Sequence, residues 1–161
     1  MASEYKYKKS LALGSVLLCI ALFVLAILLF FKFQTPKLQW GMAQTEADNV
    51  FKEQVQVSES NMVSAYESLY KANLRFGNTI FEDAVVTLHF DENAGLYRMD
   101  IQFYHDTETV IRGLGKRFGT ITESLDQTVT AIEWENEKFG VYYDVAKNNA
   151  MIYNPSAYTP L

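Results

Sequence analysis

The chain is poor in the residues that form disulfides and metal sites. Its 161 residues include one cysteine, Cys19, and two histidines, His89 and His105. Cys19 lies inside an apolar run, so the rest of the chain has no thiol with which to form a disulfide. Because zinc is held by thiolates, imidazoles and carboxylates, a site here would need several carboxylates. We therefore expect no metal and no other cofactor.

The sequence also lacks the marks of a small domain exported by an animal cell. Such domains usually carry disulfides. An N-glycosylation sequon, asparagine-x-serine or asparagine-x-threonine with x other than proline, does not occur either. Both absences favour a bacterial periplasm over a eukaryotic cell surface.

Catalytic motifs are missing as well. There is no Gly-x-Ser-x-Gly elbow. The segment RGLGKRFG, residues 112–119, has glycines and Lys116 but lacks the spacing and the lysine–hydroxyl pair of a phosphate-binding loop, so it predicts a turn with a basic edge. His89 falls on the more polar face of a predicted strand, as a surface histidine does. We expect the protein not to be an enzyme.

Charge is distributed unevenly along the chain. Residues 1–32 carry four lysines and one glutamate, whereas residues 33–161 carry ten basic and eighteen acidic side chains. Nucleic acids and anionic membrane surfaces would repel so acidic a segment. We therefore expect no nucleic-acid partner.

One long apolar run is present, LALGSVLLCIALFVLAILLFF at residues 11–31. As a helix with a rise of about 1.5 Å per residue it would be about 31 Å long, which matches the hydrocarbon core of a bilayer. Bulky residues follow it where a signal peptidase needs small ones, which predicts an uncleaved anchor. Lysines 6, 8 and 9 precede it and favour a cytoplasmic N-terminus.

This anchor divides the chain into four predicted parts. They are a cytoplasmic tail (1–10), a transmembrane signal anchor (11–31), a juxtamembrane linker (32–43) and an extracytoplasmic domain (44–161). Within the anchor, small side chains share one helical face and would let a second membrane helix approach closely. This predicted transmembrane interface consists of Ala12, Ser15, Cys19 and Ala26.

Periodicity predicts an α+β, β-rich domain. Apolar residues from 46 to 70 follow helical spacing, either as one helix or as two shorter ones. Beyond Lys71 the period becomes two, and the turn residues DENAG join two alternating runs at 84–90 and 97–103 into a hairpin. Counting KANLRF as the first, up to eight short strands follow at intervals of about ten residues, with ETVIRGL and KRFGTITES among them.

Two architectures fit this strand pattern. The first is an antiparallel meander, either strongly curved or closed into an eight-stranded, lipocalin-like barrel preceded by the helices. The second is a smaller α+β layer in which the helix lies across about five strands. The regular strand spacing favours the meander.

The side chains expected to point inward are unusually bulky. They either fill the core or line a cavity for one small apolar ligand of sterol-like or fatty character, since aromatic and methionine side chains suit both roles. These candidate pocket or core residues are Phe90, Met99, Phe103, Trp134, Phe139 and Tyr143.

Two stretches, VVTLHFDENAGLYRMDIQF and TVIRGLGKRFGTITESLDQTVTAIEWE, are similar to the middle strands of a known type of protein. With the short basic tail and the single apolar span, the layout resembles the small membrane-anchored periplasmic partners of transmembrane transcription regulators, the ToxS, VtrC and FidL type. The resemblance implies a lipocalin-like barrel, completed or stabilised by the regulator's own periplasmic domain and binding bile salts in some members.

These observations predict a non-enzymatic accessory protein of the bacterial inner membrane, with its C-terminal domain in the periplasm. It would bind and stabilise or regulate another membrane protein as a hetero-oligomer, and would sense a small apolar ligand. The alternative is a scaffold or assembly subunit of a secretion, pilus or respiratory complex, which would bind no ligand.

Overall fold

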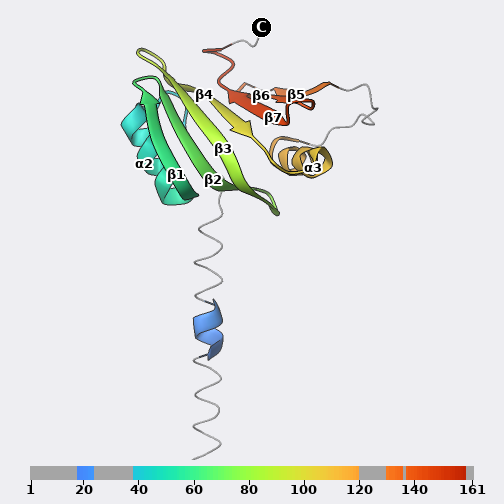
Figure 1. Cartoon of the computed structure of the whole chain (residues 1–161). Helices are drawn as coiled ribbons and strands as arrows, with labels where there is room; N and C mark the ends of the chain where they lie inside the picture. Colours follow the sequence, from blue (N-terminus) through green and yellow to red (C-terminus); the bar gives the residue numbers. More distant parts are fainter. Residues whose placement is uncertain (1–17, 24–37, 120–129, 136, 159–161) are drawn as a thin grey trace, which may run out of the picture. The chain divides into compact units, whose positions relative to one another are not determined.

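The computed structural model describes residues 18–23, 38–119, 130–135 and 137–158 (Figure 1). The chain divides into two compact units, Met1–Lys32 and Phe33–Leu161, which we describe separately.

In the first unit, residues 18–23 are helical and exposed, Cys19 among them. The rest of the predicted anchor, with Ala12, Ser15 and Ala26, lies outside the described residues. Within the described ranges, no helix has both the length and the apolar character needed to cross a membrane.

The second unit is built on one antiparallel sheet of seven strands, in the order β1-β2-β3-β4-β7-β6-β5. Two meanders, β1 to β4 and β5 to β7, join where β4 pairs with β7 (Figure 1). The strands are β1 (Gln56–Ser64), β2 (Glu67–Phe76), β3 (Thr79–Asp91), β4 (Gly95–Gln102), β5 (Ala131–Glu135), β6 (Gly140–Asp144) and β7 (Asn149–Tyr153).

The sheet is open, so the predicted eight-stranded barrel is wrong. β1 and β5 end the strand order and do not pair with each other in the described structure. Two helices, α2 (Gln44–Gln54) and α3 (Thr107–Phe118), cover the apolar face instead. Because helices bury that face, the sheet has no need to curl onto itself.

The predicted helix at 46–70 is correct only over its first part. α2 ends at Gln54, and residues 56–76 form the β1–β2 hairpin. Along β2, alternate residues from Ser68 to Phe76 are buried, which is the pattern of a half-buried strand. The first predicted strand, KANLRF, is the second half of β2.

The strand predicted at ETVIRGL is also wrong, because this segment lies in α3. Asp106 caps the helix by accepting a hydrogen bond from the Thr109 amide at 2.9 Å. Val110, Gly113 and Leu114 are buried at helical spacing. Gly113 permits this close packing, since a Cβ there would lie 2.5 Å from the Phe81 ring. The turn predicted at residues 112–119 is therefore mostly the last turns of a helix.

The predicted hairpin is confirmed as β3–β4. Val86 faces Ile101 and Leu88 faces Met99 on the buried side of the sheet. Tyr97 was expected on that side as well, but a register shift between His89 and Phe90 places Leu96 inward instead.

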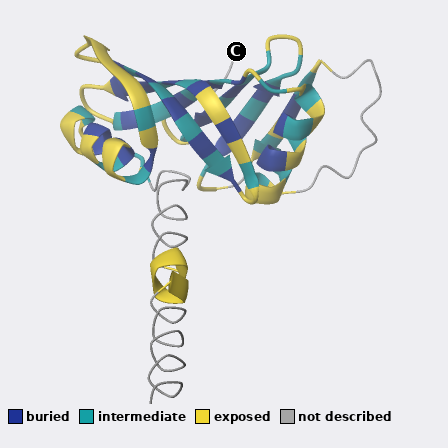
Figure 2. Cartoon of the chain, turned by 60° about the horizontal axis from the view of Figure 1, so that its bottom comes forward, coloured by how far each residue is buried: buried dark blue, intermediate teal, exposed yellow. Residues whose placement is uncertain are grey.

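A single apolar core lies between the helices and this face of the sheet (Figure 2). α2 contributes Phe51, whose ring centroid is 4.5 Å from that of Tyr70. Under α3, the centroid of the Phe81 ring lies 4.8 Å from that of Phe103 and 5.8 Å from that of Phe76. The second meander adds Val141, Tyr143, Ala150 and Ile152 to the same core.

Candidate functional site

A cavity of about 490 Å³ opens on the helical side of the sheet, above the junction of the two meanders. Met99 of β4 and Ile152 of β7 form its floor, and they face each other across the β4–β7 ladder. Its walls come from residues 38–40, the end of α3 and the loop between β5 and β6. The full lining is Leu38, Gln39, Trp40, Met99, Arg117, Phe118, Glu137, Lys138, Phe139, Ile152 and Asn154.

One wall belongs to a segment that we call the strap, residues 38–42. The Gly41 amide donates to the Leu96 carbonyl at 2.9 Å, and the Leu96 amide donates to the Met42 carbonyl at 2.8 Å. The Trp40 indole donates to the Lys138 carbonyl at 2.7 Å. This described part of the predicted linker is therefore held against the domain.

Aromatic rings make a second wall. Phe118, the last residue of α3, packs edge-on against Phe139 with ring centroids 5.1 Å apart. The Arg117 guanidinium lies 5.7 Å from the centre of the Phe118 ring. The end of α3 thus brings an apolar ring and a cation to the same pocket.

The lining of the pocket changes from apolar side chains at the floor to charged side chains at the exposed mouth. Its floor residues Met99 and Ile152 are buried, and the aromatic walls are half-buried. Arg117, Glu137 and Lys138 are exposed, and they come from the helix end and the loop. The site can hold an apolar body while charged groups stay near water.

The six residues expected to form a pocket or a core are divided between the two. Met99 and Phe139 line the cavity. Phe90, Phe103 and Tyr143 are buried in the core. Trp134 is partly buried against that core, and its indole donates to the Gly119 carbonyl at 2.7 Å.

Most of the lining was not predicted from the sequence. Trp40 lies in the predicted juxtamembrane linker, and Phe118 fell in a segment expected to be strand and turn. An N-cap at Asp106 followed by apolar residues at 110, 111 and 114 is the signal that indicates α3 and places Phe118 at its end. No local signal marks Leu38 or Ile152, because the pocket depends on the pairing of β4 with β7.

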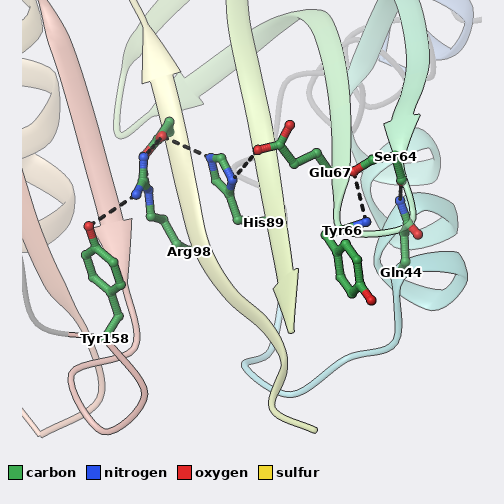
Figure 3. A network of polar contacts seen from close by, with 8 residues as sticks. Gln44, Ser64, Tyr66, Glu67, His89, Arg98 and Tyr158 are labelled. Carbon is green, nitrogen blue, oxygen red and sulfur yellow. Dashed lines mark hydrogen bonds and ion pairs between the residues drawn. The ribbon is translucent and has the colours of Figure 1, made fainter. Parts of the chain in front are cut away.

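The opposite face of the sheet carries a polar network (Figure 3). His89 lies between two carboxylates, with Nδ1 3.2 Å from Glu67 Oε1 and Nε2 3.0 Å from Asp100 Oδ2. A neutral imidazole has one N–H, so the ring donates to both carboxylates only when it is protonated. Arg98 donates hydrogen bonds to the Asp100 carboxylate, and it also donates one to the Tyr158 hydroxyl at 3.1 Å.

The network changes the ionisation of Asp100. Burial of its carboxyl favours the neutral form, but hydrogen bonds from His89 and Arg98 outweigh burial and hold its pKa below the usual value. His89, expected to be a surface histidine, is only 14% exposed at its side chain. It holds neighbouring strands together, since Glu67, His89 and Asp100 come from β2, β3 and β4.

A second polar cluster lies beneath α2. The Tyr70 hydroxyl donates to the buried Asp48 carboxylate, and Gln44 donates to the Ser68 hydroxyl at 3.0 Å. Burial and the bond to Asp48 raise the pKa of Tyr70. These contacts fix α2 on β2 and are isolated from the cavity.

Among the described residues, no cluster of three or more histidine, cysteine or carboxylate side chains could hold a metal ion. One buried polar atom within them, Nδ1 of His105, has no hydrogen-bond partner. The ring of His105 packs edge-on against the ring of Phe81, with centroids 5.3 Å apart, so His105 lies at the edge of the apolar core.

No protein-family model, no curated protein and no solved structure matches this chain.

Proposed function

We propose that the protein is a non-enzymatic accessory protein of a bacterial inner membrane, whose periplasmic domain holds a small apolar ligand and acts on another membrane protein. The observation that carries this proposal is the cavity above the β4–β7 junction. Its volume of about 490 Å³ falls within the range of sites for small molecules, about 300–1,000 Å³.

The anchor supports the membrane part of the proposal through its sequence. Residues 11–31 carry no charged side chain, and the basic residues before them favour a cytoplasmic N-terminus. Small residues at positions 12, 15, 19 and 26 offer a face for the helix of a partner. The resemblance to periplasmic partners of transmembrane regulators favours a regulator as that partner.

Location is tested with alkaline phosphatase fusions, because the enzyme becomes active only after export. We expect activity when it follows residue 161 of the natural chain and none when residues 11–31 are deleted from that fusion. An inactive fusion at residue 161 of the natural chain would contradict the proposed orientation, and activity released with the soluble periplasmic fraction would contradict an uncleaved anchor.

Ligand binding is tested on the full-length chain in phospholipid nanodiscs. The protein has two tryptophans, of which Trp40 lines the cavity and Trp134 does not. In a Trp134→Phe variant, a dibrominated fatty alcohol should quench Trp40 saturably, because bromine quenches indole fluorescence on contact. The Trp40→Phe variant, with Trp134 as reporter, controls for partition into the lipid.

A scaffold or assembly subunit is the second candidate. Met62, Val63 and Tyr66, near the β1–β2 turn, are 63%, 57% and 46% exposed. Apolar side chains gathered at one exposed end are typical of a contact surface for another protein. Under this alternative neither fatty alcohol nor fatty acid quenches Trp40 saturably, and Met62→Lys with Val63→Lys releases the chain from a large membrane complex.

A further inference from the structure

The charges at the mouth of the cavity differ from those of the rest of the domain. Residues 33–161 have ten basic and eighteen acidic side chains. Among the lining residues the balance is reversed, with two cations, Arg117 and Lys138, and one anion, Glu137. A local cationic excess on an acidic domain attracts a negatively charged group to that place.

The two cations lie where the head group of an amphiphile would lie. Both are exposed, whereas the floor made by Met99 and Ile152 is buried. Arg117 occupies the last turn of α3, and Lys138 is next to the lining residue Phe139. An apolar body on the floor would therefore place its polar end among these side chains.

The C-terminal end of α3 repels an anion, and this repulsion can be compared with the attraction of Arg117. Its free carbonyls are equivalent to about half a negative charge. Arg117, on the same turn, carries a full positive charge, and its guanidinium matches the planar fork of a carboxylate. The cation exceeds the helix end in charge and adds specific hydrogen-bond geometry.

We propose that the cavity takes an amphipathic carboxylate, with its apolar body on Met99, Ile152 and the aromatic walls and its carboxylate at Arg117 and Lys138. This inference rests on the proposed ligand-binding function and adds the chemical class of the ligand. Asn154 and Gln39, at the same mouth, can donate from their side-chain amides to the carboxylate oxygens.

The test compares two probes that differ only in the head group. A dibrominated fatty acid and the corresponding alcohol are titrated at pH 8 into the full-length Trp134→Phe chain in nanodiscs, with free probe measured by dialysis. We expect the acid to quench Trp40 with at least about ten-fold lower Kd than the alcohol. Because the cations are exposed, the preference should shrink as salt is raised.

Charge variants identify the residues responsible. Arg117→Gln with Lys138→Gln, in the Trp134→Phe background, should bring the two Kd values to within about two-fold. The matched control is Arg112→Gln with Lys147→Gln, which removes two cations that do not line the cavity and should keep the preference.

The outcomes separate the inference from the function on which it rests. Equal affinity for acid and alcohol, or an unchanged preference in the double variant, would overturn the carboxylate assignment and leave ligand binding standing. Absence of saturable quenching by either probe would overturn ligand binding itself.

Discussion

At the scale of single residues, Gly95 marks the closest approach between the strap and the sheet. Its φ is +63°, and a Cβ there would lie 2.4 Å from the Gly41 carbonyl oxygen. Only glycine fits both constraints without movement of the backbone. The sequence predicts this position only as part of a turn, and its close contact with Gly41 is seen only in the fold.

We predict that Gly95→Ala lowers the free energy of unfolding by about 1–3 kcal/mol, from left-handed strain and the clash together. It should also weaken binding of the fatty probe, because the strap would move. Gly77→Ala is the control: its φ is +60°, but the atom nearest to the added Cβ would be Lys116 Cβ at 3.1 Å, a milder contact than the one at Gly95. Urea unfolding gives the stability, and equal binding in both variants would contradict the role of the strap.

Asp100 is the second informative residue. Its folded pKa is lowered by His89 and Arg98 against the effect of burial. A depressed carboxyl pKa stabilises the fold above the unfolded value of about 3.9, and this contribution is lost as pH falls through the folded value. Part of the stability should therefore disappear on the acid side of pH 4.

Replacing Asp100 tests this. Asp100→Asn should cost about 1.5–3 kcal/mol at pH 7, because bonds to a charged group are lost. Its stability should then vary less between pH 6 and pH 3 than that of the natural chain. Asp83→Asn, which removes an exposed ion pair with Lys71 at 3.4 Å, should cost about 1 kcal/mol or less. Parallel pH profiles for Asp100→Asn and the natural chain would contradict the assignment.

At the scale of elements, α3 lines the pocket with its last turn, whereas its capped start lies at its other end. Asp106 caps its start, while Arg117 and Phe118 deliver the cation and the ring at its end. Arg117 lies eleven positions, or about three turns of helix, after Asp106, so fraying of the first turn occurs far from the cavity.

Asp106→Ala should lower Tm by about 3 °C, since the Thr109 amide loses its partner. Probe affinity should fall less than two-fold, because the final turn is packed through Phe118 and Phe139. Asp106→Asn retains an acceptor and should restore most of the Tm. A rise in the Kd of the fatty acid as large as that expected for Arg117→Gln with Lys138→Gln would contradict this independence of the two ends of α3.

Elements with strong local signals were predicted from the sequence, and those defined by distant partners were not. The β3–β4 hairpin has alternation and turn residues within twenty positions, and it is confirmed. The second half of the predicted 46–70 helix fails because Met62, Tyr66 and Leu69 fit a helical stripe, whereas β1 pairs with β2 and β2 pairs with β3 in the fold. In α3, Gly113 and Gly115 lower the helix propensity, so a helix was not predicted although the apolar residues recur at helical spacing.

Closure of the sheet could not be predicted for the same reason. A row of short strands fits both a barrel and an open sheet, and the choice depends on what covers the apolar face. Here α2 and α3 do so, and one of them was expected to be a strand. The sequence left open whether the bulky side chains fill a core or line a cavity, and of these Phe90, Phe103 and Tyr143 are buried in the core. The pocket was not located, because its lining is brought together from five separate parts of the chain.

At the scale of the whole molecule, the two meanders meet along a single five-residue ladder, from Arg98–Tyr153 to Gln102–Asn149. Asn148 reinforces one end of it by donating to the His105 carbonyl at 2.6 Å and accepting from the Tyr143 hydroxyl at 2.7 Å. The cavity floor straddles this ladder, so the pocket exists only when both halves are joined.

We predict that a chain ending at residue 148 loses the pocket, because β7 and Ile152 are missing. Tyr70 and Phe51 should still pack, since β1, β2 and α2 precede the break. Probe quenching of Trp40 should vanish while part of the β-sheet circular dichroism persists. Retained quenching would place the ligand away from Ile152.

The position of β7 near the end of the chain has a consequence for biogenesis. Because the ribosome makes a chain from its N-terminus, α2 and the first meander exist before β7 does. Ile152 therefore completes the cavity floor beside Met99 only after every other described strand has been made.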